Sequence, residues 1–515
     1  MQDKSLTIGI SERPASVGKW IVLALQHVFA MFGATVLVPL LTGLDVGVAL
    51  VASGIGTLIY ILCTRAKVPV YLGSSFAYIP AISAAVLSPA GAGAAYVGLM
   101  VVGLVYAVAA TVIRFVGSGW LKSLLPPIVI GPMIIIIGMT LAPVAVSSSG
   151  LTGGNDSYIS PRLQKTVDVS GADATADAFE DGSAVFVVED GILTVTDMTA
   201  TPSSLTPVEG MRITAYGTDP LDPSNNNLSF TQSIYEYDGT TWVAVAGDGW
   251  KIPVVALITF IAVVLLSILA KGFLRIVPFL VAILIGYAAS VTLGVVDIGA
   301  VFAGYSFFQL PDFTFIGTYA FDLSAVLMFA PLAFVTIAEH IGDHAVLGEI
   351  TGNDFLTEPG LQNTLMGDGI ATFVSAAIGG PANTTYGENT GVIAVTRVGS
   401  VYVTGLAAII AITLGFFGWI QAFINSIPWA VIGGMTIVLY GLIAANGVKV
   451  LIKDRTDLSD MKNLIIVSTM LVIGLGGASL PINSATSLSG MSLALVAGVF
   501  LNGIITGLSK LFSNR

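Results

Sequence analysis

Two stretches of sequence decide the fold: Lys67-Val-Pro-Val-Tyr-Leu-Gly-Ser-Ser-Phe76 and Gly379-Gly-Pro-Ala-Asn-Thr-Thr-Tyr-Gly-Glu388. Each begins with β-branched, glycine and proline residues and becomes compatible with a helix only at its end. At membrane depth, such backbone is tolerated only where protein buries it or where it lines a cavity. We therefore expect two short extended pieces that pair, each leading into a half-helix with free N–H groups near the membrane midplane. An ordinary re-entrant loop is the alternative.

The composition identifies a polytopic membrane protein. Of the 515 residues, 55% are hydrophobic and only 10% are charged, whereas soluble domains carry about 25% charged residues. Apolar runs near the roughly 20 residues that cross a bilayer recur along the chain. The runs and their Pro, Gly and charged borders predict about fourteen membrane segments. They are 18–41, 46–63, 69–88, 92–115, 122–147, 251–271, 274–295, 324–347, 361–379, 381–397, 400–424, 429–447, 462–480 and 488–511.

The basic residues predict the orientation of these segments. Sixteen of the twenty Lys and Arg residues lie at segment ends that face the cytoplasm if the N-terminus is inside: Lys4, Arg13, Lys19, Arg65, Lys67, Arg114, Lys122, Lys271, Arg275, Arg397, Lys449, Lys453, Arg455, Lys462, Lys510 and Arg515. By the positive-inside rule, we expect a multi-pass protein of the plasma (inner) membrane with both termini cytoplasmic. Residues 1–17 read as a cytoplasmic N-terminus before a start-anchor, without a cleavable signal peptide.

Residues 150–249 differ from the rest of the chain. They hold fifteen of the 31 acidic residues and are rich in Thr, Ser and Gly. Two hairpins are predicted, over 184–197 with a turn at Asp190-Gly191 and over 234–245 with a turn at Asp238-Gly239, because β-forming residues flank each Asp-Gly pair. We expect a small β-rich domain outside the membrane. A disordered acidic loop is the alternative.

The chain also contains an internal repeat. Pro127-Ile-Val-Ile-Gly-Pro-Met133 is similar to Trp429-Ala-Val-Ile-Gly-Gly-Met435, and Gly73-Ser-Ser-Phe-Ala-Tyr78 is similar to Asn383-Thr-Thr-Tyr-Gly-Glu388. Two halves of about seven segments each must face opposite ways, since an odd number of crossings inverts the second copy. Inverted repeats are the architecture of many secondary transporters.

Acidic residues inside predicted segments are the candidate functional groups. A charge at the bilayer centre costs roughly 2.5–3.5 kcal/mol, so Glu339, Asp343 and Glu388 are expected to have a function. Glu339 and Asp343 are four residues apart and share one helix face. Glu388 lies at the start of the second half-helix, where free N–H groups favour an anion. A carboxyl that binds and releases a proton in a membrane cavity is what proton coupling requires.

The histidines are weaker candidates. His27 lies inside the first segment and could relay protons, although a lone histidine is as often a structural residue. His340 and His344 project away from the Glu339 face in an ideal helix, which favours structural roles. The sequence contains no metal-ligand cluster, nucleophile–base pair or phosphate loop. We therefore expect neither an enzyme nor a nucleic-acid partner, and no cofactor other than the proton as coupling ion.

At these residues the sequence resembles the uracil/xanthine permeases, a family of nucleobase:cation symporters. The resemblance is carried by Ile10-Ser-Glu-Arg-Pro14, Leu25-Gln-His-Val-Phe-Ala-Met-Phe-Gly-Ala-Thr-Val-Leu-Val-Pro39, Tyr71-Leu-Gly-Ser-Ser-Phe-Ala77, Ala338-Glu-His-Ile-Gly342 and Asn383-Thr-Thr-Tyr-Gly-Glu-Asn389. It covers nearly the whole chain outside the insertion, which is not a usual feature of the family.

The resemblance implies a fold of fourteen segments in two inverted repeats, with two short membrane-buried strands. A core domain (segments 1–4 and 8–11) would move against a gate domain (segments 5–7 and 12–14), and homodimers are usual. On this division segments 1–5 occupy 18–147, segments 6–7 occupy 251–295 and segments 8–14 occupy 324–511.

The resemblance also implies a binding site. Glu339 and Glu388 match the two substrate-binding glutamates, Phe76 matches the aromatic residue that packs on the base, and Tyr386 and Gly387 match the neighbouring binding backbone. Uracil import by proton symport is the expected function, because glutamate at 388 resembles the uracil branch. Asp343 resembles the purine branch instead, so a xanthine or urate permease is the alternative. An anion carrier, which would need a basic site, and an outer binding module are further alternatives.

Overall fold

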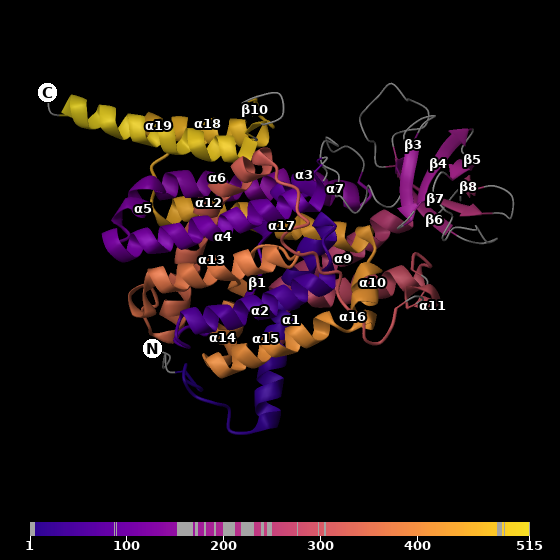
Figure 1. Ribbon diagram of the computed structural model, residues 1–515, viewed down its shortest axis with the longest axis horizontal. Helices are drawn as coiled ribbons and strands as arrows, with labels where there is room; N and C mark the ends of the chain where they lie inside the picture. Colours follow the sequence, from indigo (N-terminus) through magenta and orange to yellow (C-terminus); the bar gives the residue numbers. More distant parts are fainter. Residues whose placement is uncertain are drawn as a thin grey trace.

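The structure is a computed structural model that describes residues 6–86, 88, 90–151, 250–275, 277–296, 298–302, 305–481, 487–488 and 490–513, together with seven strands between 168 and 244. Within this part of the chain, helices dominate (Figure 1). Eight helical stretches are long and apolar enough to cross a membrane: α1 Val17–Thr42, α2 Val46–Cys63, α4 Gly91–Val116, Pro127–Val146 (α6 and most of α7), α9 Lys251–Leu269, α12 Leu323–Thr351, α17 Trp429–Lys453 and Gly490–Leu508 of α19. The chain is therefore a multi-pass membrane protein.

Shorter helices accompany these eight. Four of them are apolar: Phe76–Val86 (η1 Phe76–Tyr78 with α3 Ile79–Val86), α10 Pro278–Thr292, α15 Val401–Gly415 and α18 Met461–Leu475. The others are α5 Gly119–Leu124, η3 Gly272–Arg275, α11 Ile298–Val301, η4 Leu356–Gly360, α13 Leu361–Ala377, α14 Gly387–Thr396 and α16 Gly418–Asn425. Within the eight, α6 is Pro127–Thr140, α7 is Ala142–Ser148 and α19 in full is Gly490–Ser513.

The two stretches that begin as non-helical sequence pair with each other, which confirms that part of the prediction. β1 Leu72–Ser74 runs antiparallel to β9 Asn383–Thr385, with Gly73 opposite Thr384. Each strand is buried and leads directly into a short helix, β1 into η1 and α3, and β9 into α14. Because the strands are antiparallel, the two half-helices leave the pair in opposite directions.

Asn383 anchors this strand pair. Its Nδ2 donates to Ala52 O at 3.1 Å and to Ala371 O at 3.2 Å, so one side chain links α2 to α13. A Cβ on Gly56 would lie 2.2 Å from the same Nδ2, so only glycine allows α2 to approach this closely. The strand pair is thus held against two neighbouring helices, and its irregular backbone is buried in protein.

The long helices pack in two groups. In the first, α13 packs against α2 and α4, α15 against α1 and α2, and α12 against α4. In the second, α17 packs against α6, α7 and α9, α9 against α10, and α18 against α6 and α19. Contacts of α12 with α6 and α19, and of α1 with α10, join the two groups.

Each group contains a crossing of glycines. A Cβ on Gly369 of α13 would lie 2.9 Å from Gly103 O of α4, and one on Gly447 of α17 would lie 2.5 Å from Gly131 O of α6. Small residues at such crossings allow the backbones of membrane helices to touch.

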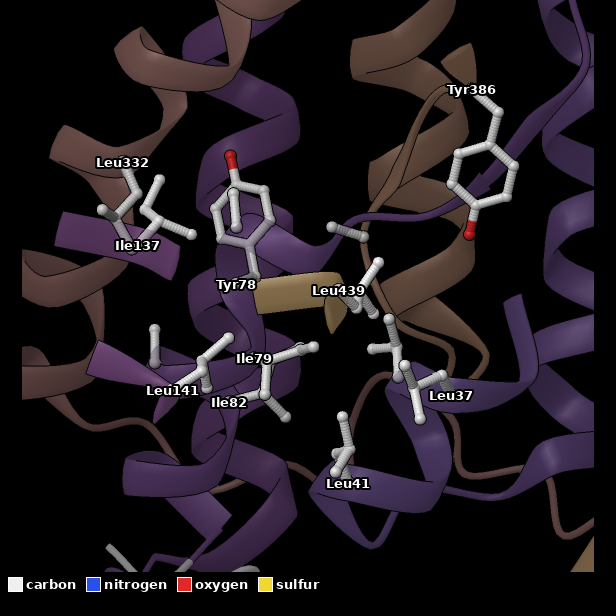
Figure 2. Packing of buried hydrophobic residues seen from close by; sticks show 14 of the residues in the cluster. Leu37, Leu41, Tyr78, Ile79, Ile82, Ile137, Leu141, Leu332, Tyr386 and Leu439 are labelled. Carbon is white, nitrogen blue, oxygen red and sulfur yellow. The ribbon is translucent and has the colours of Figure 1, made fainter. Parts of the chain in front are cut away.

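Apolar packing surrounds the strand pair. Tyr78, Ile79 and Ile82 of the first half-helix belong to one buried cluster with Ile137 and Leu141 (Figure 2). The cluster extends along α1 and onto α12 and α17. The half-helices therefore lie in the packed interior of the helical body.

At two places the helix borders differ from the borders of the predicted membrane segments. The fifth predicted segment, 122–147, contains one candidate span, Pro127–Val146, in which Leu141 separates α6 from α7, while Pro126 separates α6 from the short helix α5 before it. Segment 12 was expected to end at residue 447, but α17 continues to Lys453. Hydropathy marks where the apolar run ends, and a helix can continue past it into water.

Seven strands of the 150–249 region form one sheet, in the order β2-β6-β7-β8-β5-β4-β3. They are β2 Asp168–Val169, β3 Ala174–Phe179, β4 Gly182–Glu189, β5 Ile192–Met198, β6 Arg212–Gly217, β7 Thr231–Tyr237 and β8 Trp242–Ala244. Strands β4 and β5, and β7 and β8, are antiparallel neighbours. The turns predicted at Asp190-Gly191 and Asp238-Gly239 between them lie outside the described residues. The sheet lies at one end of the helical body, away from α5 (Figure 1).

Candidate substrate-binding site

A cavity of about 390 Å³ lies beside the strand pair. Six of the seven residues predicted for the site line it: Phe76, Glu339, Asp343, Tyr386, Gly387 and Glu388. They come from three elements that are far apart in the sequence: η1, α12, and the start of α14 with its cap. The seventh, His27, is not among the lining residues.

Both half-helices begin beside the cavity without a side-chain cap. Ser75 precedes η1 and Tyr386 precedes α14, and at each position the structure records no hydrogen bond from the capping side chain to the helix. The first N–H groups of a helix have no partner within it. A Cβ built on Gly387 meets no described atom within 4 Å. The cavity therefore gives a ligand access to hydrogen-bond donors at the start of α14.

Tyr386 is fixed by bonds across the strand pair. Its hydroxyl donates to Ser74 O at 2.7 Å and lies 3.3 Å from Thr35 Oγ1. A Cβ on Gly73 would lie 2.1 Å from the Tyr386 ring, so this glycine makes room for the ring. The Tyr386 hydroxyl is thus engaged within the protein.

Three carboxyl groups reach the cavity. Glu339 and Asp343 lie on one face of α12, and Glu388 lies in the first turn of α14. Glu339 is exposed, and Asp343 and Glu388 are half-buried. Because all three residues line the cavity, part of their exposed surface faces it. None of the cavity-lining residues that the structure describes is Lys or Arg. The cavity is therefore suited to a ligand that donates hydrogen bonds, and poorly suited to an anion.

The opposite wall is largely apolar. It is formed by α6, α10 and α17 of the second helix group through Ile134, Ile137, Phe279, Leu439, Leu442, Ile443 and Asn446. Of these seven, only Asn446 is polar. Phe76 and Phe279 both border the cavity, so a flat ring could contact aromatic side chains there. An apolar wall facing a few convergent polar groups is typical of a small-molecule site.

His27 lies beside the site and not in its lining. It is buried, and Asn389 Nδ2 approaches both its Nδ1 at 3.1 Å and its carbonyl oxygen at 3.2 Å. Asn389 follows Glu388 directly in α14. His27 therefore ties α1 to the half-helix, a contact that fits the structural role weighed for it from the sequence.

Asp368 is a buried acid that the sequence analysis overlooked. It lies on α13, completely buried, and its Oδ2 is 2.7 Å from His340 Nδ1 and 3.5 Å from Thr385 Oγ1 of β9. The His340 Nε2 is 2.9 Å from Thr364 Oγ1. An acid inside the predicted segment 361–379 was the available signal. His340 faces away from Glu339, as expected, and pairs with this acid behind the strand.

The same polar group continues along α12. The His344 ring stacks on the His340 ring with centroids 3.9 Å apart, and Tyr60 of α2 forms a hydrogen bond with His344 Nε2. The chain of polar contacts thus runs from α2 through α12 to β9, so it braces the wall that carries Glu339. Among the described residues, no three His, Cys, Asp or Glu side chains are grouped to hold a metal ion.

The fold and this cavity define a membrane permease: apolar helices enclose a polar pocket at a pair of broken segments. The sequence model of the Permease family matches residues 18–166 and 247–483, so the chain belongs to this family, and the resemblance to uracil/xanthine permeases is confirmed. The chain is 39% identical to "Uracil permease" of Bacillus caldolyticus over 97% of its length and 95% of the relative. It is 34% identical to "Uracil permease" of Escherichia coli (strain K12) over 98% of its length and 95% of that relative.

Solved structures resemble the fold at low sequence identity. The transmembrane domain of a cyanobacterium bicarbonate transporter, BicA, matches with a TM-score of 0.53 and 15% identity over 95% of this chain and 99% of that one. The murine anion transporter Slc26a9 in an inward-facing state matches with a TM-score of 0.59 and 10% identity over 97% and 70%. These likenesses concern the fold alone.

Proposed function

We propose that the protein imports uracil. The observation that carries the proposal is the convergence of Phe76, Glu339, Gly387 and Glu388 on one cavity of about 390 Å³. That volume is in the range of small-molecule sites. Relatives named uracil permease, similar over nearly the full chain, support uracil as the substrate.

The chemistry of uracil fits the groups in the cavity. Uracil is planar and neutral, and its N–H groups alternate with carbonyl groups. The Glu339 and Glu388 carboxyls would accept hydrogen bonds from the N–H groups, while N–H groups at the start of α14 would donate to a carbonyl. The Phe76 ring would contact the flat face of the base.

Proton symport is the proposed energy source. Glu339, Asp343 and Glu388 line one cavity, and none of its described lining residues is Lys or Arg. A proton that binds one of these carboxyls would therefore reduce the negative charge in the cavity. Binding of the proton and of uracil would then favour one another at the same site. No organic cofactor or metal is needed for such a cycle.

The transport movement is proposed to be that of a core domain (segments 1–4 and 8–11) against a gate domain (segments 5–7 and 12–14). The two groups in which the helices pack support this division, because the polar groups of the cavity come from one and its largely apolar wall from the other. Alternating access needs such a boundary at the substrate. We further propose fourteen membrane segments in inverted repeats, both termini in the cytoplasm, the sheet outside the plasma (inner) membrane, and a homodimer.

Uptake of radiolabelled uracil in cells that lack their own carrier tests the proposal. We expect uptake that a protonophore abolishes and that Glu388→Ala reduces to background. Glu349→Ala is the matched control, since Glu349 is exposed on α12 and does not line the cavity. Uptake that is indifferent to the proton gradient would contradict symport. Uptake of labelled xanthine or urate, without uptake of labelled uracil, would contradict the substrate.

A further inference from the structure

The N-terminal strap, residues 6–13, lies along residues 397–402. The strap contains Ile10-Ser-Glu-Arg13, from a stretch that carries the family resemblance but has no place in the cavity. Ile8 and Val398 form a parallel β-bridge. Three backbone hydrogen bonds join the two segments: from Thr7 N to Arg397 O (2.7 Å), from Gly399 N to Ile8 O (3.0 Å) and from Val401 N to Ile10 O (3.0 Å).

Side chains strengthen the contact. Ser400 precedes α15, a position where serine usually caps the helix. It makes no such cap here; instead its hydroxyl donates to the carbonyl oxygen of Glu12. The Arg13 guanidinium lies 4.5 Å from the centroid of the Tyr402 ring, a cation–π distance. The polar groups of this junction are thus used to hold the strap.

The strap also packs against elements of the binding site. Leu6 and Ile10 contact a buried apolar cluster that includes Leu72 of β1, Leu347 of α12 and Ile393 of α14. These are the strand that leads to Phe76 and the two helices that carry Glu339 and Glu388. A segment that only covered the protein surface would not need these apolar contacts.

The junction that the strap covers links the two glutamate-bearing helices. Arg397 ends α14 with φ of 58°, a left-handed conformation that is uncommon for a residue with a side chain. Its Nη1 donates to Ile350 O near the end of α12 at 3.2 Å. The strap bonds to the backbone of this same residue through Thr7 N.

We propose that the strap is a positioning element of the transport site: it fixes the Arg397 junction and so sets the separation of Glu388 and Glu339. It stays bound throughout the transport cycle, because its recorded bonds join it only to elements of the first helix group. Displacement of a binding group by about 1 Å is enough to weaken a preorganised site strongly. The proposal rests on the proposed function, since uracil uptake is its readout.

Deletion of residues 2–13 is the first test, with deletion of residues 2–5 as its control. We expect the longer deletion to raise KM for uracil by about 10-fold at an equal amount of folded carrier in the membrane. Ser400→Ala, which removes one bond, should raise KM by about threefold. Its matched control is Ser492→Ala, which removes a hydroxyl bonded to Met328 O elsewhere. An unchanged KM in Ser400→Ala, with or without a lower maximal rate, overturns the proposal.

A reversible cross-link tests whether the strap stays bound. Cys63 is the only cysteine, so Ile8→Cys and Val398→Cys can be combined with Cys63→Ala to give one possible disulfide at the β-bridge. The oxidised carrier should transport uracil with the KM and rate of the same protein after reduction. Loss of uptake on oxidation that reduction restores would show that the strap must open. Wild-type carrier without any uracil uptake would instead refute the proposed function.

Discussion

Gly387 allows a ligand in the cavity to approach the backbone at the start of α14. It is exposed and borders the cavity, and a Cβ at this position would enter space free of described atoms. Gly387→Ala should therefore leave the fold intact, since alanine favours a helix more than glycine does. The added methyl group would keep a substrate carbonyl from the N–H groups of the first turn.

We expect Gly387→Ala to weaken uracil binding by about 10-fold, the effect of losing one or two hydrogen bonds. Equilibrium binding of labelled uracil to purified carrier measures this. Gly391→Ala is the control, because Gly391 lies in the same helix, also has open space at its Cβ and does not line the cavity. Equal affinity in both variants would place the substrate away from α14.

Asp368 and Lys67 belong to two pairs of different character, a buried hydrogen-bonded pair and an exposed ion pair. The pair of Asp368 with His340 is fully buried, whereas that of Lys67 with Glu358 lies on the surface. Removing one partner of a buried hydrogen bond leaves the other partner unsatisfied and typically costs about 1–3 kcal/mol, whereas removing one partner of an exposed ion pair changes stability little. Thermal unfolding of purified Asp368→Ala and Lys67→Ala should show a large fall only for the first.

The surface pair has a pH dependence that follows from its geometry. Hydrogen bonding to Lys67 and its positive charge lower the pKa of Glu358 from the usual value for a glutamate. A lowered pKa in the folded state means that the contribution is present above the ordinary glutamate pKa and is lost as the pH falls through the lowered one. Both side chains are largely exposed, so this contribution is small.

At the scale of elements, the strand pair depends on Asn383. Its Nδ2 satisfies carbonyl groups of both α2 and α13, so Asn383→Ala leaves two buried acceptors without this donor. We expect a loss of about 1–3 kcal/mol in unfolding free energy. Thr384→Ala is the control on the same strand, because no partner for the Thr384 hydroxyl is found among the described residues. Equal melting temperatures for the two variants would contradict this role of Asn383.

The strand pair could be predicted from the sequence because proline, glycine and β-branched residues exclude a regular helix there. The partners of Asn383 could not, since they depend on how closely α2 and α13 approach. Asp368 shows the same limit: its type and place in a segment signal importance, but only packing reveals its pairing with His340. Pro126 indicates in the sequence that the fifth segment is broken there. The end of the apolar run, in contrast, does not predict that α17 extends to Lys453.

At the scale of the whole molecule, the sheet of β2 to β8 stands apart from the transport site. Its strands make their extensive contacts with one another. The cavity is lined only by residues before 140 and after 270 in the part of the chain that is described. The sheet joins the helical body between α7 and α9, at one end of the molecule (Figure 1). We therefore expect that the proposed movement between the helix groups does not require it.

Replacing residues 152–249 with a short Gly-Ser linker should leave uracil uptake nearly unchanged, with a KM within about twofold of that of the full chain. The reason is that a flexible surface linker is tolerated where it joins elements that pack in the helical body without it. Uptake kinetics and the amount of carrier in the membrane should be measured together. A large change in KM at an equal amount of carrier would show that the sheet acts on the site. A loss of carrier with unchanged KM would instead assign the sheet a role in folding, because α7 and α9 both pack against α17 and must meet it correctly.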